Sequence, residues 1–144
     1  MDNILTERQV EKYVREYLTD KGWVLQNTPR EKGEHGWDII ASHPKWNKKL
    51  FIEVKGESNS KKYKNQITHG AFYTILGQVI ARMDIAGNHP KKSRIYAIAI
   101  PSSLEKTFRQ KIHKMPYGWS LLKLKTFVVF SEDNVIEKSY TKMK

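Results

Sequence analysis

A nearly continuous apolar segment, residues 94–100, constrains the fold of this chain more than any other feature. Strands without alternation of apolar and polar residues are typical of parallel pairing, in which both faces of the sheet are buried. Helices must then cover both faces, and the predicted order of elements is α, β, β, β, α, β, α, β, β. We therefore expect a single α/β domain with a mixed central sheet flanked by helices.

Local signals place the predicted helices. A capping box formed by Thr6 and Gln9 begins the first helix, which carries an apolar stripe at helical spacing. A second apolar stripe predicts a helix over residues 71–83. Ser102 and Glu105 are typical of the cap of a third helix.

The remaining apolar segments are predicted to be strands, and the basic stretch 56–66 is predicted to be a loop. The last two strands form a closing hairpin. The predicted strands are residues 23–26, 38–42, 50–54, 94–100, 121–130 and 135–140.

Charge and composition narrow the classes of function. The 26 Lys and Arg residues outnumber 15 Asp and Glu, and the resulting charge of +11 suits a polyanionic partner, either nucleic acid or an acidic membrane surface. The absence of cysteine excludes a disulfide framework and thiolate chemistry. No signal peptide or transmembrane-length apolar run is present, so we expect a protein of the reducing cytoplasm.

Two short strings of sequence are candidates for catalytic chemistry. Gly-Trp-Asp at residues 36–38 opens one predicted strand, and Glu-Val-Lys at residues 53–55 closes the next one. Charges at strand ends alone are usually a solvated rim of the sheet. If the two strands pair as a hairpin, however, the carboxylates of Asp38 and Glu53 converge at one end.

Such a pair of carboxylates is suited to a divalent metal. Mg²⁺ prefers oxygen ligands and keeps several waters. The protein therefore needs to supply only a few ligands, and Asp38, Glu53 and the backbone carbonyl of Val54 are enough. Lys55 follows Glu53 by two residues and shares its face of the strand, where an ammonium can hold or help deprotonate an attacking water. The metal would lower the pKa of that water and polarise a phosphoryl oxygen. The pattern predicts phosphodiester hydrolysis.

Motifs and element order together resemble the PD-(D/E)xK nuclease superfamily, which has the restriction-endonuclease-like fold. The similar branch has Gly-x-Asp as its first motif and includes archaeal-type Holliday junction resolvases and Mrr-like nucleases. Its αβββαβ core corresponds to residues 6–100, and residues 101–144 add a C-terminal helix and β-hairpin to the same domain, 1–144.

The resemblance implies a Mg²⁺-dependent endonuclease that hydrolyses DNA, with Mn²⁺ able to substitute. The enzyme could be a restriction-type, a junction-resolving or a phage or mobile-element nuclease. It also implies a homodimer, a 5′-phosphate product, and neither a membrane nor a small-molecule cofactor.

Two supporting residues are carried over from the resemblance. The resolvases place an acidic residue on the first helix to assist the metal site, and Glu11 matches it by spacing, whereas Glu7 and Glu16 are interpreted as solvated charges. Many members of the branch place a glutamine on the second core helix, facing the lysine. Gln78 is the candidate for that position and Gln66 is the rival.

Several further residues have less specific patterns. Lys61, Lys62 and Lys64 form the best local phosphate-binding stretch, directly after the Glu-x-Lys strand. The five histidines lack ligand spacing, although His35 and His69 lie where they can approach the site.

Alternatives to a DNA nuclease remain open. A basic DNA-binding module or subunit that keeps the fold without turnover is one, and RNA as the substrate is another. The role of Trp37 is also open, because an indole beside the motif either stacks on a base or packs in the core.

Overall fold

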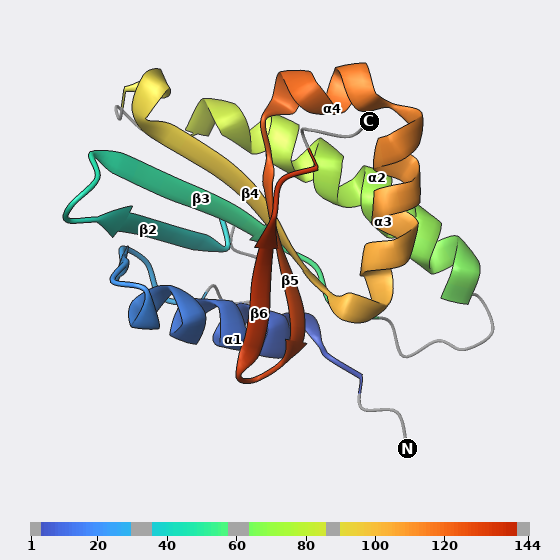
Figure 1. Cartoon of the computed structure of the whole chain (residues 1–144), viewed down its shortest axis with the longest axis horizontal. Helices are drawn as coiled ribbons and strands as arrows, with labels where there is room; N and C mark the ends of the chain where they lie inside the picture. The colour runs from blue at the N-terminus through green and yellow to red at the C-terminus, as the bar shows by residue number, and fades with distance from the viewer. Residues whose placement is uncertain (1–3, 30–35, 58–63, 86–89, 141–144) are drawn as a thin grey trace.

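The computed structural model describes residues 4–29, 36–57, 64–85 and 90–140, and within these ranges it contains four α-helices and six strands (Figure 1). Two short 3-10 helices, Met83–Ile85 and Lys91–Ser93, separate the second helix from the fourth strand. In chain order the elements are α1 (Glu7–Asp20), β1 (Val24–Leu25), β2 (Ile39–His43), β3 (Lys48–Val54), α2 (Lys64–Arg82), β4 (Arg94–Pro101), α3 (Ser102–Lys114), α4 (Pro116–Leu122), β5 (Lys125–Ser131) and β6 (Asn134–Lys138).

The sheet is mixed, as predicted. Its strands lie in chain order from β1 to β6; β1, β2 and β3 pair antiparallel, β3, β4 and β5 pair parallel, and β6 returns antiparallel to β5. The predicted apolar strand is β4, which lies in the middle of the sheet and is buried over its last five residues. The C-terminal hairpin is therefore confirmed, and β5 joins the central sheet through its parallel pairing with β4.

Two apolar cores form, one on each face of the sheet. Neighbouring residues of β3 alternate between them: Phe51 packs in the core under α2 and α3, and Ile52 packs in the core under α1. Figure 1 shows the corresponding layers, with α1 on one face and α2 and α3 on the other. Trp37 is 1% exposed and stacks on Tyr96 with ring centroids 5.5 Å apart, so its indole is a core residue rather than a platform for a base.

The helical segments differ from the sequence predictions at three places. Pro101, without a side-chain capping bond, is the N-cap of α3, so the predicted cap at Ser102 is wrong. Part of the predicted strand 121–130 belongs to α4, whose Pro116 fits the first turn because the missing N–H would be unpaired there. Helix α2 begins at Lys64, inside the predicted loop.

Gly56 allows the end of β3 to lie against the start of α1. A Cβ added there would lie 2.0 Å from the backbone nitrogen of Glu7. The two segments are also joined by hydrogen bonds, because the Glu57 N–H donates to the Leu5 carbonyl at 2.9 Å and the Glu57 carboxylate accepts from the Leu5 N–H at 2.6 Å. This close approach brings the first turn of α1 to the sheet end that carries Glu53 and Lys55.

Gly56→Ala is expected to destabilise the fold by about 2–3 kcal/mol, because the backbone of α1 must move away from the added methyl group. The free energy of unfolding in urea measures this loss. Gly77→Ala is the matched control: no atom lies within 4 Å of its added Cβ, and alanine should stabilise the helix by about 0.5–1 kcal/mol. Equal effects of the two substitutions would contradict the proposed close packing.

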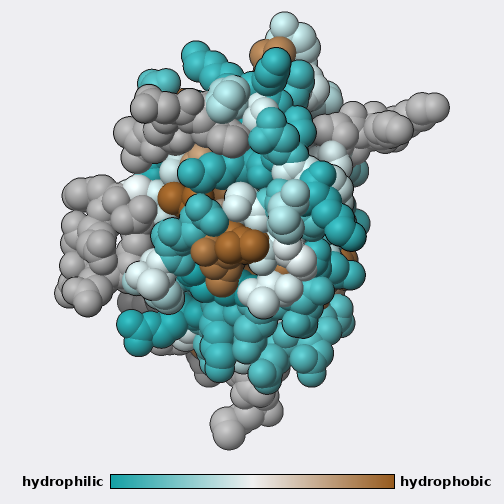
Figure 2. Space-filling model, turned by 90° about the vertical axis from the view of Figure 1, so that its left-hand side faces the viewer, coloured by the Kyte–Doolittle hydropathy of each residue, from teal (hydrophilic) through white to brown (hydrophobic). Residues whose placement is uncertain are grey.

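One face of the molecule is largely polar. Figure 2 shows the left-hand side of Figure 1, which is mostly hydrophilic with a small hydrophobic patch near its centre. None of the helices in the described part of the chain is both long and apolar enough to cross a membrane. Because basic residues outnumber acidic ones by 26 to 15, the surface is expected to attract polyanions.

Candidate functional site

The start of β2 and the end of β3 lie together at one end of the sheet. Ile39 pairs with Ile52 in the antiparallel register, so Asp38 and Glu53 are the next residues to face each other. The Oδ2 atom of Asp38 accepts a hydrogen bond from the Val54 N–H at 2.8 Å. The predicted hairpin is confirmed, and it brings both carboxylates to the same end.

Glu53 is a buried carboxylate in an unfavourable environment. The residue is 2% exposed, its Oε2 lies 2.7 Å from Nη1 of Arg82, and its Oε1 is buried without a hydrogen-bond partner among the described residues. Burial and the charge on Asp38 together raise the pKa of Glu53 from 4.5 to about 8, against the opposing effect of Arg82. A cation beside the free oxygen would stabilise the ionised pair.

Lys55 is the first residue beyond β3 and is half-buried. Its N–H donates to the carbonyl of Ala99 at 2.9 Å, so pairing between β3 and β4 continues for one further residue. Its charge opposes the rise in the pKa of Glu7, so the ammonium is within electrostatic reach of the first turn of α1. Lys55 therefore lies at the same sheet end as Asp38 and Glu53.

Helix α1 contributes two carboxylates to this end of the sheet. Burial raises the pKa of Glu11, and the Asp38 charge also raises it, although the ion pair with Arg15 at 2.9 Å opposes both. Glu7 is exposed at the rim; partial burial raises the pKa of its carboxylate, followed by the charges on Asp38 and Glu11. Both carboxylates lie close enough to Asp38 for its charge to raise their pKa values, so the interpretation of Glu7 as an isolated solvated charge is incomplete.

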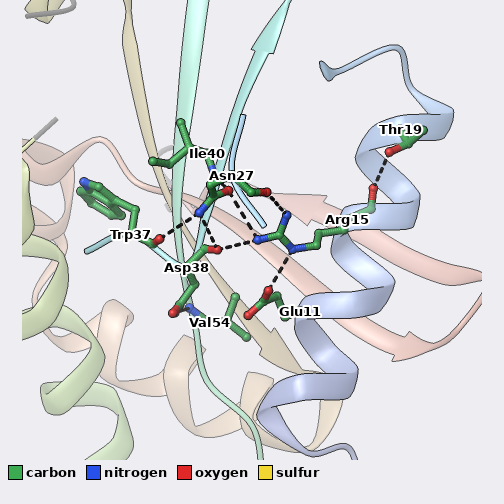
Figure 3. A network of polar contacts seen from close by, with 8 residues as sticks. All are labelled: Glu11, Arg15, Thr19, Asn27, Trp37, Asp38, Ile40 and Val54. Atoms are coloured by element: carbon green, nitrogen blue, oxygen red, sulfur yellow. Dashed lines mark hydrogen bonds and ion pairs between the residues drawn. The ribbon is translucent and has the colours of Figure 1, made fainter. Parts of the chain in front are cut away.

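A buried polar network fixes the backbone at Asp38 (Figure 3). Arg15, 8% exposed, donates to the carbonyls of Asn27 at 2.6 Å and Asp38 at 2.8 Å and to the Glu11 carboxylate at 2.9 Å. The Asn27 amide donates to the Asp38 carbonyl at 3.1 Å and accepts from the Ile40 N–H at 2.8 Å. Since α1, the segment after β1 and the start of β2 all join this network, it sets the position of Asp38.

Among the described side chains of α2, Arg82 reaches the site through its ion pair with Glu53. The predicted Gln78 lies one helical turn earlier, is half-buried and has no hydrogen bond to another described residue, so its role stays a prediction. Gln66 lies in the first turn of α2, but its side chain falls outside the described part. The structure therefore does not decide between the two glutamines.

Several predicted contacts lie outside the described residues. Lys61, Lys62 and His35 are not described, and of Lys64 and His69 only the helical backbone is. Their proposed contacts with phosphate or with the site stay predictions.

The carboxylates present suit a magnesium site in which the protein supplies few of the ligands and water supplies the others. Among the residues that the structure describes, no three His, Asp or Glu side chains are grouped to hold a metal. Mg²⁺ is usually bound by one or two carboxylates and keeps several waters. Asp38 and the Oε1 atom of Glu53, which has no hydrogen-bond partner among the described side chains, meet that requirement, with Val54 at the same strand end. Arg82 is a competing positive charge on the other Glu53 oxygen.

Sequence reasoning missed four residues that surround the carboxylates: Glu7, Arg15, Asn27 and Arg82. Glu7 and Arg15 each lie four residues from Glu11, and this helical spacing was a usable signal for them. Arg82 is a cation that follows a long apolar stretch of helix, a weaker signal. Nothing in the local sequence marks Asn27, because its partners are backbone groups on another strand.

Comparison with known proteins agrees with the fold. A family model described as Protein NO VEIN, C-terminal, matches residues 6–72, less than half of the 144-residue chain. A search of curated proteins found no match. Two similar crystal structures are an XisH family protein from Nostoc punctiforme and a fdxN element excision controlling factor protein from Anabaena variabilis. Each has 24% identity and a TM-score of 0.57, with 88% of this chain and 95% of the other covered, so this chain shares its mixed α/β fold with both.

Proposed function

We propose that this protein is a metal-dependent endonuclease that hydrolyses DNA phosphodiester bonds, built on the restriction-endonuclease-like core of the PD-(D/E)xK superfamily. The observation that carries the proposal is the pair Asp38 and Glu53, which meet at one sheet end, where a buried oxygen of Glu53 has no hydrogen-bond partner in the described part of the chain. The observed order from α1 to β4, αβββαβ, supports the core. A structural neighbour described as an excision controlling factor supports a DNA-related role.

The proposed chemistry assigns one task to each residue. Asp38, Glu53 and the carbonyl of Val54 would hold Mg²⁺ or Mn²⁺, and the ion would supply a Lewis acid and lower the pKa of bound water. Glu53 would be ionised as a ligand, because a cation offsets the effects of burial and of the Asp38 charge. Lys55 orients the attacking water and offsets negative charge that grows on the phosphate.

The other predicted residues have supporting roles in this proposal. Glu11 assists the metal ligands from α1, and Gln78 faces the lysine from α2. Lys61, Lys62 and Lys64 contact phosphates of the bound DNA. A homodimer would allow two sites to cut both strands of a duplex or the two arms of a junction.

The proposal is tested by incubating the protein with supercoiled plasmid, a four-way junction or single-stranded RNA in Mg²⁺, Mn²⁺ or chelator. We expect cleavage of one of the DNA substrates with either metal and none in chelator. Asp38→Ala and Lys55→Ala should each abolish it while leaving DNA binding intact. Cleavage that persists in chelator, or in both variants, would rule out the mechanism.

A second function, DNA binding without turnover, is favoured by one specific contact. Arg82 already holds an oxygen of Glu53 at 2.7 Å and supplies a permanent counter-ion where the nuclease would use a metal. The two functions differ in how the protein responds to Mg²⁺ without DNA. The nuclease should gain about 2.7 kcal/mol of stability when Mg²⁺ exceeds its dissociation constant a hundredfold, seen as a rise in the thermal midpoint at pH 8. The binding module should show no such rise.

A further inference from the structure

The turn between β2 and β3 presents an exposed indole at the opposite end of the hairpin from Asp38 and Glu53. Trp46 is 54% exposed and stacks on the ring of His43, with centroids 4.0 Å apart and planes 18° apart. Trp23 packs edge-on against both, at 5.2 Å from His43 and 5.7 Å from Trp46. We call Trp23, His43 and Trp46 the aromatic tip. Because His43 covers one face of the exposed indole, the opposite face is turned to solvent.

The aromatic tip is held in place by backbone hydrogen bonds. Nε2 of His43 lies 3.3 Å from the carbonyl of Lys21 at the end of α1, and the N–H of Lys45 donates to Nδ1 of the same ring at 3.2 Å. The N–H of Lys48 donates to the carbonyl of Trp46 at 2.6 Å. A ligand that stacks on Trp46 therefore meets a surface that is already ordered, which lowers the entropic cost of binding.

Cationic side chains lie beside the aromatic tip on two chain segments. The segments are residues 43–49 and 90–94, which contain no Asp or Glu. They are joined where Nζ of Lys48 donates to the carbonyl of Lys92 at 3.0 Å. Both lie on the left of Figure 1, on the mostly hydrophilic face that Figure 2 shows. The lysines on these segments are Lys45, Lys48, Lys49, Lys91 and Lys92.

We propose that this surface binds single-stranded nucleic acid, with Trp46 stacking on an unpaired base and the neighbouring lysines contacting phosphates. Base–aromatic stacking combined with a basic groove is the general means by which proteins hold single strands. A duplex covers both faces of each base and gains nothing from an indole. An acidic peptide would complement the charge of the lysines but has no base to stack on the Trp46 ring. An anionic membrane surface is the rival occupant, because tryptophan and lysine also suit a membrane interface.

Binding of a single strand at this surface would supply substrate to the proposed nuclease site. The binding itself does not depend on nuclease activity. Lys49 and Glu53 are four residues apart on one strand, roughly 13 Å at the usual rise per residue. A single-stranded nucleic acid bound at the aromatic tip would therefore have nucleotides only a few positions away at the carboxylates. Binding needs no metal, so it is measured in chelator, where failure to bind and failure to cut are separate results.

The test uses the fluorescence of the protein itself. Trp46 is the exposed tryptophan, while Trp23, Trp37 and Trp119 are 9%, 1% and 1% exposed, so quenching by a ligand reports mainly on Trp46. The probes are twelve-nucleotide oligo-dT and oligo-U, a blunt duplex of the same length and phosphatidylserine vesicles. We expect both single strands to quench the emission, and the stronger binder identifies DNA or RNA as the natural source.

Variants separate stacking from charge. Substitutions at Trp46 remove the emitting side chain, so binding by the variants is followed by the anisotropy of a labelled oligonucleotide. Trp46→Ala should weaken oligonucleotide binding roughly tenfold and Trp46→Phe much less, while duplex binding stays unchanged. Tyr117→Ala, at a 77% exposed aromatic residue on α4, is the matched control and should have no effect. Lys45→Gln with Lys91→Gln should reduce the salt dependence of binding. Equal behaviour of Trp46→Ala, Trp46→Phe and Tyr117→Ala, or a response to vesicles without one to oligonucleotides, would overturn the proposal.

Discussion

Glu53→Gln is expected to abolish cleavage and, in the absence of metal, to make the protein more stable at alkaline pH. An amide cannot replace a carboxylate as a ligand of Mg²⁺, and a loss of several kcal/mol of transition-state stabilisation lowers the rate on the order of a thousandfold. The same amide has the shape of the protonated carboxyl group and never ionises. It therefore removes the cost of burying a negative charge beside Asp38.

The sign of the stability change follows from the pKa of Glu53. Folding raises that pKa from 4.5 to about 8, so between these values the folded protein holds a proton that the unfolded chain has lost. The stabilising contribution is complete below about pH 4.5 and is lost as pH rises through about 8. Each unit of pKa corresponds to about 1.4 kcal/mol, so the free energy of unfolding of the metal-free wild type should fall by on the order of 5 kcal/mol over this range.

Urea unfolding in chelator at pH 5, 7 and 9 measures this dependence, which the Glu53→Gln substitution should flatten. Glu105→Gln is the control, and it should leave the pH dependence between pH 5 and 9 unchanged. Burial raises the pKa of Glu105, but hydrogen bonds from Tyr140 and Lys138 prevail and hold it below its usual value. The stabilising contribution of Glu105 is therefore present above about pH 4.5 and is lost as the pH falls through the lowered pKa of this carboxyl group. A wild-type stability that is level from pH 5 to 9 would contradict the assigned environment of Glu53.

Arg15→Met is expected to cost about 3–5 kcal/mol of stability, because truncating one partner of a buried charge network leaves the others unpaired. The carbonyls of Asn27 and Asp38 would each lose a donor, and Glu11 would lose its counter-ion. Arg15→Lys should recover only part of the loss, since an ammonium cannot reach three acceptors in the fixed geometry of a guanidinium.

The measurement is again the free energy of unfolding. Arg8→Met, at an exposed arginine on the same helix, is the control and should change it by less than about 0.5 kcal/mol. If Arg15→Met and Arg8→Met behave alike, the network in Figure 3 does not hold β2 in place.

Short-range signals made part of this structure predictable. The capping box of Thr6 and Gln9 is present, and the hairpin that joins Asp38 to Glu53 has the predicted pairing. In both cases the information lies in residues close together in the chain. The same type of reasoning failed at Leu121 and Leu122, because a short apolar pair fits a strand or a buried helix equally well.

The surroundings of the carboxylates could not be predicted in the same way. Arg82 lies 29 residues from Glu53, and Arg15 lies 23 residues from Asp38, so both contacts depend on how helices pack on the sheet. Glu7 reaches the site because Gly56 lets two backbones approach, and no pattern in the sequence reports such a distance.

The packing of α1 limits how early the protein can finish folding during its synthesis. Tyr17 of this first helix donates a hydrogen bond to Glu137 of β6 at 2.6 Å, across 120 residues of chain, and its ring packs against Phe127 of β5. During synthesis, the helix that carries Glu11 and Arg15 has no complete surface to cover until β5 and β6 have left the ribosome. The two carboxylates at the end of the β2–β3 hairpin should therefore reach their final positions only after β6 has been synthesised, about 80 residues later in the chain.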